Sequence, residues 1–317
     1  ADIGAMAAAA ELLIPAPFAV LTLMFTAIIL VLEIFTSYRV YSKILKWLAL
    51  ALLSYPITVF IIHQDWPVVL KATVIPHFEF SFAFLFIITG VFGTTITPYM
   101  FFWEASQEVE EIKEEGLVKK DKKPAIGWDH IRKMRMDNNA GMLISEFTTW
   151  CILLVGATVL HKSGVKDIKT AADAARALEP MVHSFPNAGF LAKLIFSVGI
   201  IGLGLLAVPV LSGSAAYAVA EAFDWKASLN LKLKRAHGFY GVITVATIIG
   251  LTINFIGIDP VKALVCTAVL NGVAAVPLLF LIVRIASSEK IMGKFKSGWL
   301  SKALLWFTFV AMGAAAI

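Results

Sequence analysis

The chain has 317 residues, of which 59% are hydrophobic and 15% are charged. Soluble domains carry roughly 45–50% apolar and about 25% charged residues, so a water-soluble fold could not bury this much apolar surface. The net charge of +5 would be compatible with nucleic-acid binding, but the basic residues lie in loops between long apolar stretches. That pattern is typical of a protein oriented in a lipid bilayer, and it predicts no nucleic-acid partner.

Apolar stretches along the chain predict an all-α polytopic membrane protein, because backbone groups in hydrocarbon must pair within a helix. The nine predicted spans are 1–14, 17–36, 43–63, 81–103, 139–160, 189–209 (running on to about 223), 237–256, 260–284 and 298–317. They form a single transmembrane domain over 1–317. Segment 107–135 is predicted as a charged loop. Segment 161–188 is predicted as a loop with a short helix, which a Thr170–Asp173 capping box opens and Pro180 ends.

The basic residues also predict the orientation of the chain. Alternate loops hold 20 Lys and Arg residues, and the opposite loops hold 7. By the positive-inside rule the side with twenty faces the cytoplasm. The N-terminus and 107–135 are then cytoplasmic, and the C-terminus and 161–188 are extracellular. Because 1–14 is short for a span of about 20 residues, we expect the chain to begin within a longer protein.

The fourth span carries the clearest functional signal, in the sequence Gly93-Thr-Thr-Ile-Thr-Pro98. Pro98 cannot donate to the helix and clashes with the carbonyl four residues before it. Freed carbonyls, with the hydroxyls of residues such as Thr94 and Thr97, describe a broken helix, a common construction of ion sites in transporters. The alternative is a kinked helix with threonines bonded back to it. On these residues alone the two interpretations are equally supported.

Several carboxylates are candidate cation ligands. Glu146 lies deep in the fifth span, where a charge costs at least ~2.5 kcal/mol, so we expect it to face a polar interior and bind the cation. The alternative is a protonated carboxyl bonded to a neighbouring helix. Glu104, Glu108, Glu111 and Glu115 share one helical face. These four residues form either an acidic stripe that guides cations or a face solvated by water. A solvated face is favoured for Glu111 and Glu115. Glu104 differs because it lies close to the break.

The remaining embedded polar residues narrow the class of ion. Asn271 and Asn254 lie in the middle of predicted spans. Each is either a cation ligand or a contact between packed helices, and the packing role is favoured for Asn254. Glu33 and Glu221 lie near span ends, where a carboxylate reaches the headgroups, and we assign them no role. None of the six histidines falls mid-span, and neither cysteine forms a ligand motif. Oxygen donors of this kind suit Mg²⁺, Ca²⁺ or Mn²⁺ better than Zn²⁺ or Cu²⁺.

Three segments, Gly93–Glu110, Thr170–Pro180 and Leu205–Phe223, resemble the NRAMP divalent-metal transporter family. Phe239-Tyr-Gly and Asn254–Pro260 are similar to its divergent prokaryotic branch, which includes NRAMP-related magnesium transporters. The resemblance runs along essentially the whole chain. It implies a LeuT-like inverted repeat of eleven helices with two broken helices, of which this chain holds the third to the eleventh. It also implies a location in a prokaryotic plasma membrane.

The resemblance further implies a metal site. In that family the metal is held by an Asp and an Asn of the first helix, and by a carbonyl and a Met of a Met-Pro-His motif. Here Thr97-Pro98-Tyr99 stands at that motif, Thr94 falls at the carbonyl position, and Asn271 falls near a tenth-helix ligand. A hydroxyl in place of the thioether favours Mg²⁺, with Mn²⁺ as a further substrate. Tyr99 and Glu104 in place of two histidines imply weak or no proton coupling.

The sequence thus predicts a secondary transporter or facilitator of divalent cations that works by alternating access. The metal is the transported ion, and no cofactor is expected. Because the first two helices of the resembled fold lie outside this chain, we do not expect these 317 residues to transport alone. The alternatives are an amino-acid or amine transporter on the same fold, and a non-transporting membrane protein. An enzyme is not expected, because no loop holds a nucleophile–base pair or a metal-ligand cluster.

Overall fold

A computed structural model describes most of the chain. The described residues are 1–36, 43, 47, 50–75, 78–117, 126–161, 168, 170–184, 186–229, 231 and 233–316. All regular structure within these residues is helical. Five helical stretches among them are long and apolar enough to cross a membrane: Phe18–Phe35, Phe82–Lys113, Trp128–Leu160, Ala188–Ala222 and Pro260–Ser287. The predicted all-α class is confirmed, and these helices are consistent with a polytopic membrane protein.

The chain forms two compact units, each built from segments that are far apart in the sequence. The first unit comprises Ala1–Val74 and Phe102–Val261, and the second comprises Ile75–Phe101 and Lys262–Ile317. The chain therefore passes from the second unit to the first directly after Phe101. The single transmembrane domain expected over 1–317 stays a prediction.

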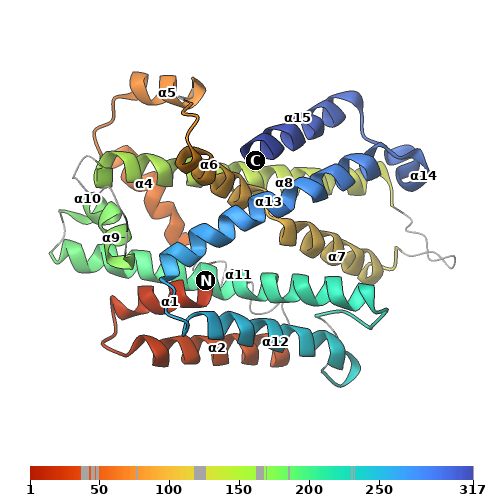
Figure 1. The fold of residues 1–317 in the computed structure, drawn as a ribbon, viewed down its shortest axis with the longest axis horizontal. Helices are drawn as coiled ribbons and strands as arrows, with labels where there is room; N and C mark the ends of the chain where they lie inside the picture. Colours follow the sequence, from red (N-terminus) through yellow and green to blue (C-terminus); the bar gives the residue numbers. More distant parts are fainter. Residues whose placement is uncertain are drawn as a thin grey trace. The chain divides into compact units, whose positions relative to one another are not determined.

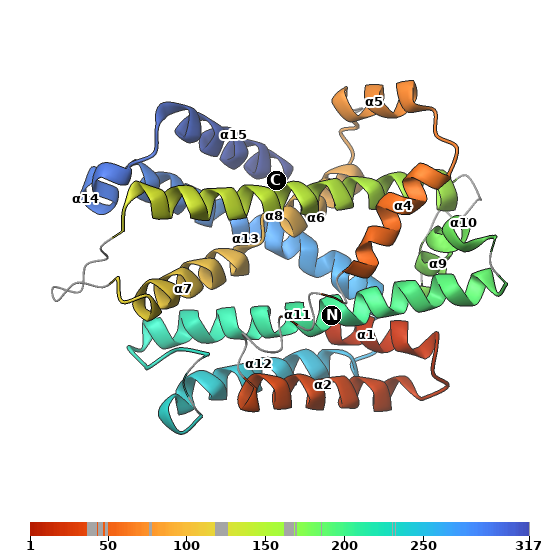
Figure 2. The ribbon, with the colours of Figure 1, turned by 180° about the vertical axis from the view of Figure 1, so that it is seen from behind.

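Four helices form the centre of the first unit. They are α1 (Asp2–Glu11), α2 (Phe18–Phe35), α11 (Ala188–Ala222) and α12 (His237–Ile253). Figures 1 and 2 show α1 and α12 lying along α11, with α2 beside α12. A Cβ atom at Gly204 of α11 would collide with the Met6 side chain of α1, and the Ser197 hydroxyl donates to the Ala9 carbonyl at 2.6 Å. Small and hydroxyl side chains thus bring these helices together, as is usual in membrane bundles.

Shorter elements complete the first unit. They are a 3₁₀ turn (Leu50–Leu53), α4 (Ser54–Ile61), α5 (Trp66–Val74), α8 (Trp128–Val155), a π-helix (Gly156–His161), α9 (Ala171–Ala175), a 3₁₀ turn (Arg176–Leu178), α10 (Glu179–Val182) and a 3₁₀ turn (Leu233–Arg235). The capping box is confirmed, since the Thr170 hydroxyl accepts from the Asp173 N–H at 3.1 Å and the Thr170 N–H donates to the Asp173 carboxylate. The prediction that Pro180 ends this helix is wrong. Pro180 lies in the first turn of α10, where its missing N–H leaves no helical bond unmade.

The second unit contains α6 (Phe82–Thr95), most of α13 (Pro260–Ser287), α14 (Glu289–Met292), a 3₁₀ turn (Gly293–Phe295) and α15 (Trp299–Ala315). Glycines bring α6 and α13 into direct backbone contact. A Cβ atom at Gly93 would collide with the Ala268 carbonyl oxygen and the Gly272 amide nitrogen. Only a residue without a side chain allows this approach. The Thr89 hydroxyl, one turn earlier, donates to the Ala315 carbonyl and joins α6 to α15.

Each of the nine predicted spans contains a described helix, but the loops differ from the prediction. Segment 107–135 is helical at both ends, because α7 (Pro98–Glu114) continues well into it and α8 begins at Trp128. Both helices continue past the apolar stretch with charged residues that water can solvate. The number of membrane crossings, the orientation and the LeuT-like topology stay predictions.

Candidate metal site

The predicted interruption of the fourth span is confirmed. α6 ends at Thr95 and α7 begins at Pro98, so Ile96 and Thr97 lie outside the helices. Ile96 has φ −112° and ψ 79°, although its N–H still makes a helical bond of 2.7 Å. Pro98 has no N–H to donate, so the Thr94 carbonyl loses its ordinary helical partner. The alternative was a kinked helix with threonines bonded back to it. The helix is not continuous here, but the Thr94 hydroxyl does bond back to it, as that alternative expected.

The two candidate threonines at the break offer different groups. Thr94 is exposed, and its hydroxyl donates back to the Val91 carbonyl at 2.8 Å. Thr94 therefore presents its carbonyl more readily than its side chain. Thr97 is only 7% exposed, and its carbonyl accepts from the Met100 N–H at 3.1 Å. Among the described residues no hydrogen bond engages the Thr97 hydroxyl, which leaves this oxygen available to an ion.

Asn271 lies in the same unit as the break, although the sequence separates the two widely. Asn271 is half-buried on α13, directly before Gly272, whose backbone packs against Gly93. Gly93 directly precedes Thr94. The close approach of the two glycines therefore brings the helical turn that carries Asn271 to the turn that ends α6. A carbonyl, a hydroxyl and an amide oxygen are the kinds of ligand that hard divalent cations prefer.

Glu104 lies in the first unit, in an acidic cavity between α7 and α8. The cavity has a volume of about 140 Å³ and is lined by Glu104, Glu108, Glu111, His130, Lys133, Met134, Asp137 and Asn138. The His130 Nε2 atom lies 2.6 Å from the Glu108 carboxylate. The predicted acidic face of α7 thus borders one cavity as far as Glu111, whereas Glu115 does not line it.

Glu146 lies apart from this cavity. Its side chain is exposed on α8, in an apolar stretch that begins after Asp137 and Asn138. Within its unit Glu146 does not face the polar interior that the sequence led us to expect. Its role in metal binding stays a prediction.

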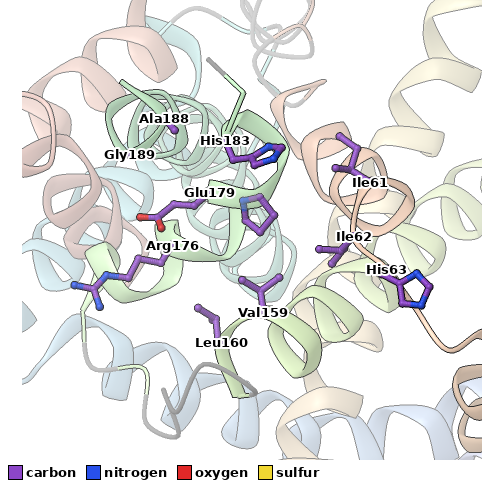
Figure 3. A pocket seen from close by; sticks show the side chains of 11 residues that line it. Ile61, Ile62, His63, Val159, Leu160, Arg176, Glu179, His183, Ala188 and Gly189 are labelled. Carbon is purple, nitrogen blue, oxygen red and sulfur yellow. The ribbon is translucent and has the colours of Figure 1, made fainter. Parts of the chain in front are cut away.

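A larger cavity of about 780 Å³ opens between α4, the π-helix, α10 and the start of α11 (Figure 3). His63, His183, Glu179 and Arg176 line it together with apolar residues. Figure 3 shows the two histidines on different segments, and their side chains do not converge on a common point. Across the described part of the chain, no three His, Cys, Asp or Glu side chains are placed to hold a metal ion. This cavity therefore lacks the arrangement of a metal centre.

Glu33 is the polar residue that sequence reasoning misjudged. It was expected to reach the headgroups, but it is only 2% exposed, and its Oε1 atom accepts from the Ser212 hydroxyl of α11 at 2.5 Å. Its other carboxylate oxygen is buried without a hydrogen-bond partner. The spacing of Thr22, Thr26 and Glu33 along one face of α2 was the available signal, since all three are buried.

Asn254 has the packing role that was favoured for it. Its side-chain amide donates to the Gly250 carbonyl at 2.8 Å, and its Oδ1 atom lies where a Cβ at Gly4 would have to be. The amide thus bonds to carbonyls of α12 itself, and the side chain packs against α1 at a point where α1 has no side chain.

Comparison with known proteins assigns the chain to a family. The model of the natural resistance-associated macrophage protein-like family (Nramp) matches residues 1–317. The chain belongs to the NRAMP family. The resemblance drawn from the motifs at Gly93–Glu110 and Leu205–Phe223 is thereby confirmed.

Among its NRAMP relatives is a protein of Caldanaerobacter subterraneus subsp. tengcongensis named divalent metal cation transporter MntH, which is 27% identical over 281 residues. That alignment covers 87% of this chain and 60% of the relative. Proteins with the same name from Ralstonia nicotianae and Vibrio campbellii are 23% and 24% identical, over 83% and 81% of this chain and 56% and 54% of their own lengths. The chain therefore spans somewhat more than half of these relatives, which are named as transporters and not as enzymes.

Proposed function

We propose that the protein moves a divalent cation across the membrane by alternating access, on a LeuT-like inverted repeat. The observation that carries the proposal is the interruption of the fourth span at Ile96–Thr97. An unwound segment between two helix halves exposes backbone oxygens where hydrocarbon would otherwise leave none, and this construction recurs at ion sites in transporters. Membership of the NRAMP family, with relatives named as divalent metal cation transporters, supports the same function.

We assign the ion to the oxygens of Thr94, Thr97 and Asn271. The backbone contact between Gly93 and Gly272 supports placing these three residues around one ion. Thr97 supplies a hydroxyl where the family motif has a methionine sulfur. A hydroxyl is a hard donor, so we assign Mg²⁺ as the main substrate and Mn²⁺ as a second one. We further propose that transport is weakly proton-coupled or uncoupled, since Tyr99 and Glu104 replace the two family histidines.

The acidic cavity gives Glu104 a second role in this proposal. With the orientation that the basic residues predict, α7 leads from the break towards the cytoplasm. Carboxylates gathered in a cavity attract cations and raise their local concentration. Glu104, Glu108 and Glu111 would therefore collect or release the ion on that side. We propose Glu146 as a further cation-binding carboxylate, on the grounds of its position in an apolar stretch.

Uptake into liposomes tests the substrate. The protein as its gene encodes it is reconstituted, and Mg²⁺ uptake is measured against competing Mn²⁺ and Cd²⁺. We expect Mn²⁺ to compete and Cd²⁺ to compete poorly. In Thr97→Met, which restores a soft sulfur donor, Cd²⁺ should inhibit at lower concentration than in the wild type. Thr97→Leu has the same bulk without sulfur and is the matched control. Strong Cd²⁺ preference in the wild type would contradict the assignment of a hard ion.

A further inference from the structure

A carboxylate on α7 is bonded by two separate segments of the first unit. The Tyr217 hydroxyl of α11 donates to the Glu110 Oε1 atom at 2.6 Å, and the Ser228 hydroxyl donates to the Glu110 Oε2 atom at 2.9 Å. Tyr217 and Glu110 are 107 residues apart in the sequence. Glu110 therefore links α7 to α11 and to the loop that follows α11.

The Tyr217 hydroxyl has further hydrogen-bond partners. The Leu229 N–H and the Gln107 side-chain amide donate to the Tyr217 oxygen at 3.2 and 3.3 Å. Tyr217 is 3% exposed, so it has no water to replace these partners. The Tyr240 hydroxyl of α12 donates to the Leu231 carbonyl at 2.8 Å and fixes the far end of the loop. We call Glu110, Tyr217 and Ser228 the clasp.

α7 meets α11 at a second point, seven residues before Glu110 and so on the same helical face. The Trp103 ring lies edge-on to the Tyr217 ring, with centroids 6.2 Å apart, and it covers Gly213, where a Cβ atom would come within 2.6 Å of it. Figures 1 and 2 show α7 beside the C-terminal half of α11. The second half of the interrupted helix is therefore attached to α11 by Trp103 near the break and by the clasp towards its far end.

We propose that Glu110 is a positioning residue for transport, which fastens α7 to α11 so that the two move as one body while the unwound residues Ile96 and Thr97 act as the hinge. The proposal rests on the proposed transport function. It follows from the geometry because a helix that begins at a break has no helical bonds to hold its direction there. The direction of α7 must then come from side-chain attachments further along α7. The clasp is such an attachment, because it joins α7 to α11 and to the loop that follows α11.

The alternative is that the clasp only anchors the loop after α11. Two single substitutions compare the two roles. Ser228→Ala removes only a bond from the loop, whereas Tyr217→Phe removes the bond from α11 to Glu110 together with the bond from the Leu229 N–H of the loop. If Glu110 positions α7, Tyr217→Phe and Glu110→Gln lower the maximal rate of Mg²⁺ uptake by about tenfold. The KM should stay close to the wild-type value, since the ligands at the break are unchanged. Ser228→Ala should have the smaller effect, and Glu115→Gln, an exposed carboxylate on the same segment, serves as the matched control.

A reversible cross-link gives the sharper test. Cys151 and Cys266 are first replaced by alanine, and Glu110→Cys with Tyr217→Cys, which places one thiol on α7 and one on α11, is then introduced into the complete protein. A cavity of about 360 Å³ beside Glu110 gives a reagent access to this position. The double-thiol protein should transport slowly, a short bifunctional methanethiosulfonate should restore the rate, and reductant should abolish the recovery. A merely structural role of the loop would not produce this reversible gain.

The outcomes separate the two proposals. If the wild type takes up no divalent cation, the transport function fails. If the wild type transports and Tyr217→Phe and Glu110→Gln match it, the clasp has no positioning role. If the cross-link stops transport and reductant restores it, α7 and α11 must part during the cycle, and the one-body proposal is overturned. Elution as a single folded species in detergent, checked for each variant, guards against misfolding as the cause of a lost rate.

Discussion

Pro98 and Pro209 each follow a glycine by five residues inside a long apolar segment, yet only Pro98 interrupts its helix. α11 runs from Ala188 to Ala222 without a break at Pro209, whereas Ile96 and Thr97 leave the helix before Pro98. A proline in such a helix is therefore not enough to interrupt it. The residues around it decide whether the helix continues.

The residues before each proline explain the difference. Before Pro98 stand Thr94-Thr95-Ile96-Thr97, all of them β-branched, which crowd a helix and favour extended backbone. Before Pro209 stand Leu205-Leu206-Ala207-Val208, of which the first three are good helix formers. A run of β-branched residues and a proline act together at the break, since both disfavour the helical conformation of the preceding residue.

We expect the largest loss of transport when the four residues before Pro98 are replaced by the four that precede Pro209. In the variant Thr94→Leu, Thr95→Leu, Ile96→Ala and Thr97→Val we expect the helix to continue to Pro98 and cation uptake to fall to about one hundredth of the wild-type rate or less. Uptake into liposomes measures the rate, and hydrogen exchange of this segment measures its helicity. Thr94→Val with Thr95→Val keeps the β-branching and should keep the break. Full activity of the helix-forming variant would show that the interruption is dispensable.

A smaller effect distinguishes the two threonines at the break. Thr97→Ala removes a hydroxyl and should raise the KM for Mg²⁺ by about tenfold, as expected for one lost contact to a charge. Thr94→Ala keeps its carbonyl and removes only a hydroxyl that bonds to its own helix, so its KM should remain close to that of the wild type. The two KM values, measured side by side in liposomes, check this. Equal effects would mean that the side chain of Thr94 also binds the ion.

The smallest expected effect is a change in the free energy of unfolding. It concerns Gly93 and Gly204, which lie five residues before Pro98 and Pro209. A Cβ atom at Gly93 would collide with backbone atoms of α13, whereas one at Gly204 would collide with the flexible Met6 side chain. Gly93→Ala should therefore lower the free energy of unfolding in detergent by about 2–3 kcal/mol, and Gly204→Ala by about 1 kcal/mol. Gly241→Ala on α12, with nothing within 4 Å of the new Cβ, is the control. A larger loss for Gly204→Ala would show that the Met6 side chain cannot rearrange.

Some features of this molecule could be read from the sequence because they depend on neighbouring residues. The apolar stretches predicted a helix in every span, the Thr170–Asp173 pair predicted its capping box, and Gly93–Pro98 predicted the break. Helix bonds, caps and proline clashes act within about one turn, so a short window contains their cause. Asn271 also proved to lie in the unit that holds the break. Its mid-span position had left it open as a ligand or a packing contact, and the family resemblance had pointed to the metal site.

The tertiary structure decided which embedded polar groups are buried and what they meet. Glu33 is bonded to a serine 179 residues away, and the Glu110–Tyr217 bond spans 107; neither partner is visible from the local sequence. Glu146 shows the converse, because its apolar surroundings in the sequence predicted that it faces a polar interior, and it is exposed in its unit. The sequence by itself determined the helices and the place where one of them stops. Only packing between helices that are distant in the sequence determined the environment of each carboxylate. The burial and the hydrogen-bond partners of a side chain depend on residues that become its neighbours only when the chain folds.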